Sequence, residues 1–196
     1  ELDKAGRVKV HLLRGRASAE AYRGINGNEL YAAAAAEVAR QYPSRAAKNL
    51  VIPAFTFFDA NTARALAHTA LGGGNLGLFG GGNLFTWPDS LATAQAAFMD
   101  ARRVDPAKFL SDSVGRNTYW ACASTTMGAA LHELGHTFGL PHSNDPQGIM
   151  TRGHDRLNRF FTLVEPPHAR RASSYAFKAD EVARWAPVSG QALAAQ

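Results

Sequence analysis

The stretch HELGHTFGLPH, residues 132–142, limits most strongly what this chain can fold into, because it requires three histidines and a glutamate to meet. Residues four apart on a helix lie about 40° apart around its axis and one turn apart along it. His132 and His136 can therefore converge on one ion. Glu133 lies beside them, rotated slightly away, where its carboxylate is next to the ion without being a ligand. We expect a helix with an apolar back and a metal-binding front.

A third ligand requires the chain to turn back. Gly139 stands where the end of a helix favours a left-handed residue, and Pro141 prevents the helix from resuming. This turn would carry His142 towards the ion. Three neutral imidazoles leave one position of a tetrahedral zinc site open, which is typical of catalytic rather than structural zinc. A carboxylate next to such a site can accept a proton from water, and this predicts Glu133 as the general base.

The extended pattern H-E-x-x-H-x-x-G-x-x-H is identified as the signature of the metzincin peptidases. These enzymes also carry a methionine turn after the third histidine, and Met150 in QGIMTRG fits it. The run HELGHTFGLPHS locally resembles matrixins. A closer likeness, over about residues 75–162, rests on LFTWP, TYWACAS, LHELGHTFGLPH and GIMTRGHDRLNRFF. These segments resemble zinc metallopeptidases described in fungi, which are metzincin-like and sometimes joined to jacalin-like lectin domains. The resemblance implies a peptidase fold and Zn²⁺, and it implies Met150 as an apolar floor under the imidazoles.

One departure concerns the transition state. Some metzincins carry a tyrosine two residues after the methionine, and Arg152 stands at that position. Support could come instead from Arg152 itself, His154 or Tyr175. Asp155, Asn158 and Arg159 are interpreted as structural residues that pin the wall of a specificity pocket. Cys122 is interpreted as a small core residue. His11, His68 and His168 lack the spacing of metal ligands and are interpreted as non-ligands.

The composition excludes several classes of protein. Apolar residues make up 46% and charged residues 19% of the 196, which is an ordinary globular balance. The formal net charge of +5 comes without the aromatic or helical reading surface of nucleic-acid modules. No apolar run approaches the roughly 18 residues that span a bilayer. The single cysteine leans towards a reducing compartment, although secretion stays open. Because the chain opens on Glu1, we interpret it as a fragment or a processed chain.

Hydrophobic patterns predict the first half of the fold. Alternation over residues 7–13 predicts a strand, and an alanine-rich helix follows with Asn28 as its N-cap and Pro43 as its stop. The run 49–58 is expected to be an inner strand, with Pro53 at an edge or a bulge. The glycine-rich segment 72–84 contains G-x-G-x-x-G, but no helix can open directly after it, so an edge strand is favoured over a nucleotide site.

Helical spacing predicts the remaining elements. A helix over 89–103 would be capped by Asp89 or Ser90 and would bury Leu91, Ala94, Phe98 and Met99. The motif helix would begin at Ser124 or Thr125 and would bury the stripe Met127, Leu131, Leu134 and Phe138. A short closing helix is expected from Ala179, Val182, Ala183 and Ala186.

Together these features predict an α/β zincin fold of the α+β, metzincin-like kind. Residues 1–196 would form one catalytic domain, with a twisted, mixed but mostly parallel sheet and the active-site helix at the cleft floor in residues 1–139. A small irregular part, residues 140–196, would carry the third ligand, the methionine turn and the last helix. The predicted function is a monomeric zinc endopeptidase that acts on proteins or peptides, with glycoproteins left open and nucleic acid excluded. The alternative is a zinc-bearing binding module of the same fold that holds peptides or glycoproteins without cutting them.

Overall fold

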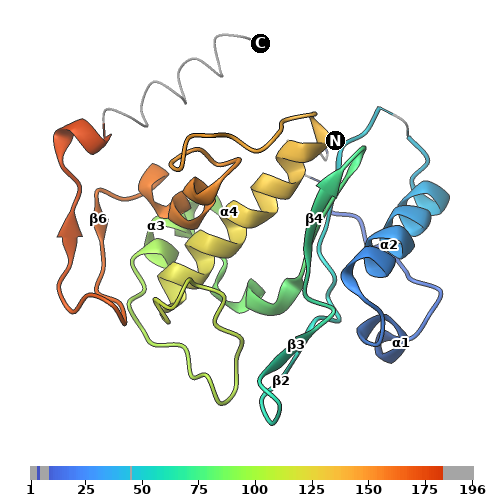
Figure 1. The fold of residues 1–196 in the computed structure, drawn as a ribbon, viewed down its shortest axis with the longest axis horizontal. Coiled ribbons are helices and arrows are strands. Elements are labelled where there is room, and N and C mark those ends of the chain that lie inside the picture. Colours follow the sequence, from blue (N-terminus) through green and yellow to red (C-terminus); the bar gives the residue numbers. More distant parts are fainter. Residues whose placement is uncertain (1–3, 5–8, 45, 183–196) are drawn as a thin grey trace.

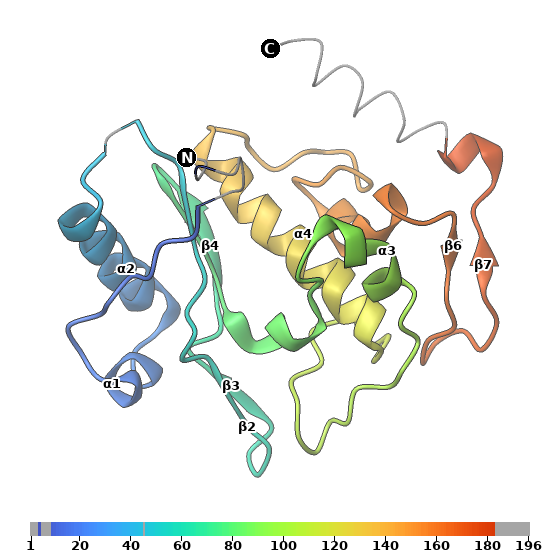
Figure 2. The ribbon, with the colours of Figure 1, turned by 180° about the vertical axis from the view of Figure 1, so that it is seen from behind.

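The computed structural model describes residues 4, 9–44 and 46–182. Its longest helix, α4 (Tyr119–Thr137), runs through the middle of the molecule (Figure 1). A three-stranded sheet lies along one side of α4, and η2 lies along another. Seen from behind, α3 packs beside α4 (Figure 2). The other elements are α1 (Ala19–Arg23), α2 (Gly27–Gln41), α3 (Leu91–Phe98), the 3₁₀ helices η1 (Gly81–Thr86) and η2 (Arg152–Phe160), and the strands β1 (Asn49–Val51), β2 (Phe57–Asp59), β3 (Arg64–Leu66), β4 (Ala70–Gly73), β5 (Leu76–Phe79), β6 (Val164–Glu165) and β7 (Tyr175–Ala176).

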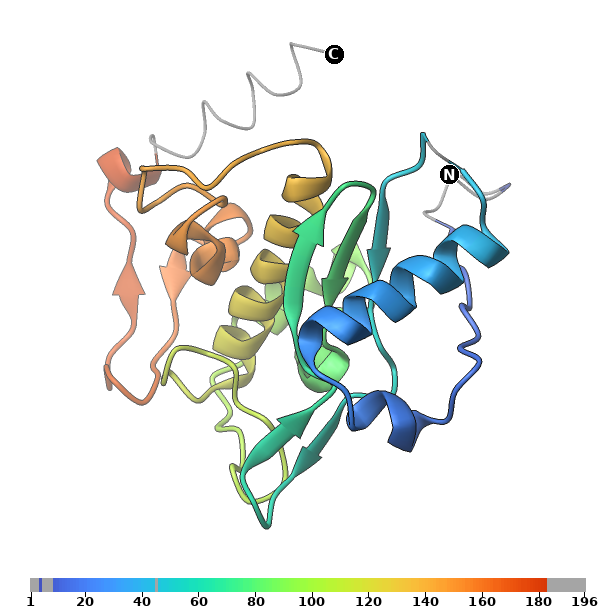
Figure 3. The same cartoon turned by 45° about the vertical axis from the view of Figure 1, so that its right-hand side comes forward.

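The main sheet has the strand order β1-β5-β4 and separates α2 from α4 (Figure 3). Mixed helices and sheets confirm the α+β class. The expectation of a mostly parallel sheet is wrong for the described strands, because only β1 and β5 pair in parallel, whereas β4–β5, β2–β3 and β6–β7 are antiparallel. The cause is the two-residue turn Gly74–Asn75 between β4 and β5, in which Gly74 has a φ of 53°. A turn this short can join only antiparallel neighbours.

Two strand predictions are wrong. Residues 9–13 form no strand, and Val10 and Leu12 are 86% and 84% exposed, while residues 7 and 8 lie outside the described residues. Alternating polarity marks a strand only where a partner pairs with it. The run 49–58 does not form one inner strand, since it divides around Pro53 into β1, an edge strand of the main sheet, and β2, part of a separate hairpin.

The N-terminal boundary of α2 shows how a capping box decides where a helix begins. Asn26, and not Asn28, is the N-cap: its Oδ1 accepts a hydrogen bond from the Glu29 amide at 3.0 Å, and the Glu29 carboxylate accepts one from the Asn26 amide at 3.0 Å. This reciprocal pair satisfies two amide groups that the first turn leaves unpaired. The helix ends at Gln41, two residues before Pro43.

The N-cap of α4 is Thr118, six residues before the predicted Ser124. Ser124 and Thr125 are instead buried inside the helix. The side chain of Ser124 donates to the carbonyl oxygen of Asp155 at 3.0 Å and to Oδ1 of Asn158 at 2.9 Å, so it joins α4 to η2.

The predicted buried faces of α3 and α4 are correct only in part. Ala94 and Phe98 of α3 pack in a core cluster with Ala123 and Leu157, and Met127 packs against that cluster, but other expected core residues are exposed. The reason is that α4 is surrounded: its first half is buried on several faces at once by small residues, so a single apolar stripe does not describe it. The predicted core residues that are exposed are Leu91, Met99, Leu131 and Phe138.

Near the end of the described chain, residues 179–182 are helical, as predicted from Ala179 and Val182. Ala183 and Ala186, the other residues of that prediction, lie outside the described residues. Within the described part of the chain, no helix is both long and apolar enough to cross a membrane.

Replacing Asn26 by alanine should lower the free energy of unfolding by about 1 kcal/mol, because the cap of α2 is lost. Urea denaturation followed by circular dichroism measures this change. Asn28→Ala is the matched control: Asn28 is exposed and lies within the first turn, so its replacement should leave the stability unchanged. Equal losses from the two variants would contradict the capping box.

Candidate metal centre

Three histidines from two segments converge below the end of α4. His132 and His136 lie one turn apart on the helix, and His142 lies on the loop that follows it. One ring nitrogen from each of the three lies within 4.8 Å of the others, and the Nε2 atoms of His132 and His136 are 3.1 Å apart. Among the described residues, this is the group of histidine, cysteine or carboxylate side chains that could hold a metal ion.

Backbone carbonyls fix the tautomers of two of these rings. Nδ1 of His132 donates to the carbonyl oxygen of Ile149 at 2.8 Å, and Nδ1 of His136 donates to that of Leu140 at 2.9 Å. Because a carbonyl can only accept, both Nδ1 atoms carry the proton and both Nε2 atoms present a lone pair in the neutral rings. Two lone pairs 3.1 Å apart repel each other unless a cation lies between them. The donor set therefore fits a divalent metal that binds imidazole nitrogen.

The chain reversal that brings in the third histidine depends on Gly139. Its φ is 76°, and its amide donates to the carbonyl oxygen of His136 at 3.0 Å. A Cβ at this position would meet no atom within 4 Å, so the backbone conformation and not crowding is what calls for glycine. The helix ends here, and Pro141 and His142 follow on the returning chain.

Met150 lies under the motif helix. Its side chain is buried, and a Cβ added to Gly135 would lie only 2.5 Å from its Sδ atom, so the thioether touches the backbone between the two helical histidines. The Ser143 amide donates to the carbonyl oxygen of Met150 at 3.1 Å, and the Thr151 hydroxyl donates to that of Ser143. These bonds tie the turn that contains Met150 to the segment that carries His142.

The backbone of Glu133 lies in close contact with the β4–β5 hairpin. Its side chain and backbone are 8% exposed, and a Cβ at Gly72 would overlap its carbonyl oxygen, while one at Gly77 would lie 2.9 Å from the Leu134 amide nitrogen. The two glycines let the β4–β5 hairpin lie directly on the helix backbone. The segment 72–84 is therefore an edge only where it contributes to β4, since β5 is the central strand.

The environment of Glu133 alters its acidity. Burial raises the pKa of its carboxyl group, and the nearby His136 and His142 oppose that rise. A carboxylate with a raised pKa is a stronger base than one in water. This is the property expected of a group that accepts a proton next to a metal.

Tyr31 of α2 is a residue near the site that the sequence reasoning missed. Its hydroxyl lies 2.8 Å from the carbonyl oxygen of Gly73 and 3.1 Å from that of Leu76, so it holds the two ends of the β4–β5 turn. Burial, and after it the charge of Glu133, raise the pKa of Tyr31. The available signal was an aromatic residue at the start of the run YAAAAA, which otherwise contains only alanine.

The candidates for transition-state support occupy different places. The His154 ring lies 5.1 Å from that of His132, centroid to centroid. Arg152 is exposed and forms an ion pair with Asp155 at 2.6 Å. Tyr175 belongs to β7, and its hydroxyl donates to Glu181 at 2.6 Å. The segment between β6 and β7 packs against the first turn of α4, where Nε1 of Trp120 donates to the carbonyl oxygen of Pro167 at 3.3 Å. This turn is at the end of α4 opposite to the histidines.

The remaining residues singled out in the sequence have structural surroundings. Asp155 and Asn158 attach η2 to α4 through Ser124, and Cys122 is fully buried, as predicted for a core residue. His68 lies 3.4 Å from Asp112, the His168 ring stacks edge-on against Trp120, and the His11 ring stacks edge-on against Tyr42.

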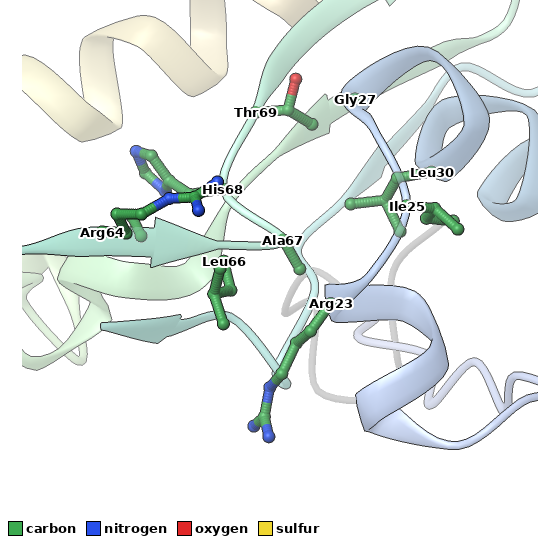
Figure 4. A pocket seen from close by; sticks show the side chains of 10 residues that line it. Arg23, Ile25, Gly27, Leu30, Arg64, Leu66, Ala67, His68 and Thr69 are labelled. Atoms are coloured by element: carbon green, nitrogen blue, oxygen red, sulfur yellow. The ribbon is translucent and has the colours of Figure 1, made fainter. Parts of the chain in front are cut away.

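A small polar cavity of about 140 Å³ lies between α1, the start of α2 and β3 (Figure 4). Arg23 and Arg64 both line it, but Figure 4 shows their side chains directed apart. The Nε atom of Arg23 donates to the carbonyl oxygen of Phe55 at 2.8 Å. These positive groups do not converge on a common point, so the cavity has no evident ligand.

Substitution of Gly72 by alanine should destabilise the protein by about 1–3 kcal/mol, because the new methyl group overlaps the Glu133 carbonyl. Gly73→Ala is the control, since a Cβ there would have Tyr31 as its nearest contact at 3.9 Å. Thermal unfolding of the two variants measures the difference. Equal melting temperatures would contradict the close packing of the hairpin on α4.

Comparison with known proteins gives consistent descriptions. The profile of a family described as "Putative peptidase family" matches residues 3–191. A "putative zinc metalloproteinase" of Schizosaccharomyces pombe is 36% identical over 160 residues, which are 80% of this chain and 26% of that protein. One of Saccharomyces cerevisiae is 37% identical over 123 residues, 61% of this chain and 17% of that protein. The chain thus spans about a quarter or less of these relatives. No solved structure matches it significantly.

Proposed function

The chain belongs to the putative peptidase family, and we propose that it is a zinc-dependent endopeptidase in which Glu133 is the general base. The observation that carries this proposal is the pair of Nε2 lone pairs 3.1 Å apart, oriented by carbonyl groups and flanked by a buried carboxylate. His132, His136 and His142 would hold the ion. The yeast relatives, whose names specify zinc, support the choice of metal.

The mechanism assigns a separate task to each group. The chemistry that zinc supplies when bound is Lewis acidity towards water and towards a peptide carbonyl. Glu133 accepts the proton of the attacking water and then transfers it to the amine of the leaving peptide. Its burial and raised pKa suit both transfers. The carbonyls of Ile149 and Leu140 keep the two helical imidazoles in the tautomer that can bind metal.

We further propose that the domain is metzincin-like. Residues 1–139 would form the upper part above the cleft and residues 140–196 the lower part, with Gly139 at the boundary and Met150 as the floor. β4 is the outer strand of the main sheet beside Glu133, so an extended substrate could add to its free edge by main-chain hydrogen bonds. We expect the protein to act as a monomer on proteins or peptides, glycoproteins included.

A binding module that holds zinc without hydrolysis is the alternative. The burial of Glu133 argues against this alternative. Burying a carboxylate is unfavourable in free energy, and a module that only binds does not require a carboxylate at this position.

Replacing Glu133 by glutamine should leave zinc content unchanged and reduce hydrolysis by at least about 100-fold, since general-base catalysis typically contributes that much. Metal content is measured by mass spectrometry and hydrolysis with casein. Gln95→Glu, a change of charge on the distant helix α3, serves as the control and should leave activity intact. Retained hydrolysis in Glu133→Gln would exclude Glu133 as the base.

Removal of the metal should abolish hydrolysis reversibly. We expect one zinc per chain, loss of casein cleavage with 1,10-phenanthroline, and recovery on adding zinc, because three imidazoles form one site. His142→Ala should lower zinc occupancy, whereas His68→Ala should not. Zinc without cleavage would favour the binding module, and absence of zinc would refute the assignment of the three histidines.

A further inference from the structure

A cavity of about 500 Å³ lies between the loop 145–149 and η2. Two residues of its lining contact a histidine of the metal centre: the carbonyl oxygen of Ile149 accepts the Nδ1 proton of His132 at 2.8 Å, and the His154 ring lies 5.1 Å from the His132 ring. The cavity therefore shares a wall with the metal centre. Its volume falls in the range of ligand sites, about 300–1,000 Å³.

The lining combines apolar walls with an excess of positive charge. Ile149, Leu157 and Phe160 supply apolar surface, while Arg156 and Arg159 supply two guanidinium groups. The carboxylate among the lining residues is that of Asp145, which accepts a hydrogen bond from the Gln147 amide of its own loop at 2.8 Å.

The carboxylate nearest in sequence to these arginines is already engaged. Asp155 pairs with Arg152 at 2.6 Å. The side chain of Arg156, by contrast, makes no hydrogen bond or ion pair with the described residues. Burial, and after it the charge of Arg156, lower the pKa of Arg159, although Glu165 and Glu181 oppose this change. Two like-charged side chains therefore line one cavity, and an anion placed there would reduce the repulsion between them.

We propose that this cavity receives an acidic side chain of the substrate next to the bond that is cut, held by Arg156 and Arg159. Guanidinium groups bind carboxylates through paired hydrogen bonds, and an acidic side chain is the group that presents a carboxylate within a peptide substrate. The apolar walls favour glutamate over aspartate, since its additional methylene group can pack against Leu157 and Phe160. This inference rests on the proposed peptidase function and specifies the substrate class of the same site.

The test uses the zinc-loaded protein and pools of short peptides that differ only in a fixed central residue, Glu or Gln. We expect the Glu pool to be cleaved with a kcat/KM about tenfold higher, the effect of one charge-assisted hydrogen-bonded contact. Mass spectrometry of the products locates the cut relative to the fixed residue. Amidated and free-acid versions of each pool separate a side-chain carboxylate from a terminal one.

Three variants connect the preference to the cavity. Arg156→Gln should bring the Glu-to-Gln ratio towards one, and Arg156→Glu, at an exposed position that tolerates charge, should favour a pool with a central Lys. Arg64→Gln, on the distant β2–β3 hairpin, should leave the ratio unchanged. An unchanged ratio in Arg156→Glu would overturn the proposal, as would a preference that disappears on amidation.

A binding measurement separates this inference from the proposed function. Fluorescence anisotropy of the labelled pools with zinc-loaded Glu133→Gln reports recognition without hydrolysis. Hydrolysis by the native protein with no charge preference would overturn the inference and leave the peptidase. Tighter binding of the Glu pool without hydrolysis by the native protein would support the cavity and overturn the peptidase. Equal binding of both pools without hydrolysis would overturn both.

Discussion

The contact between the β4–β5 hairpin and the backbone of α4 at Glu133 is the constraint on which the site depends. Gly72 and Gly77 bring a strand within reach of a helix backbone, a distance that any side chain would enlarge. Gly128 does the same on another face of α4, where a Cβ would overlap the carbonyl oxygen of His154. The helix is therefore held between two backbone contacts. The two contacts therefore fix where His132 and His136 lie relative to the β4–β5 hairpin and to η2.

Buried polar groups complete the attachment of η2. A terminal nitrogen of Arg116, a buried residue, donates to Oγ1 of Thr125 at 2.6 Å and to the carbonyl oxygen of Asp155 at 2.7 Å. Ser124 donates to the same carbonyl. Since breaking a buried hydrogen bond leaves its partner without water, these contacts resist displacement more than exposed ones would. They hold in place the segment that carries His154 and the two arginines of the cavity.

The features that the sequence predicts correctly are those that depend on residues close together in the chain. The convergence of His132, His136 and His142 follows from the pitch of a helix and a left-handed glycine, so the local pattern suffices. Sheet order does not follow in that way, because it depends on which distant segments meet. The contact of Tyr31 with Gly73 spans 42 residues and has no local signal. The buried faces of α4 differ from the predicted stripe for a related reason. A single apolar stripe presumes that the opposite face of the helix is exposed to solvent, whereas α4 is covered on several faces.

The two Nδ1 hydrogen bonds of the metal centre have a consequence for turnover of the protein. They run from α4 to Leu140 and Ile149, near the two ends of the loop that also carries His142. An ion bound by all three rings would close that loop onto the helix, so the loop and the centre would open as one cooperative unit. The free energy of this opening then rises with the concentration of free zinc, by mass action. When free zinc is scarce, residues 140–149 would therefore become more accessible to proteolysis, and the lifetime of the chain would depend on its metal supply.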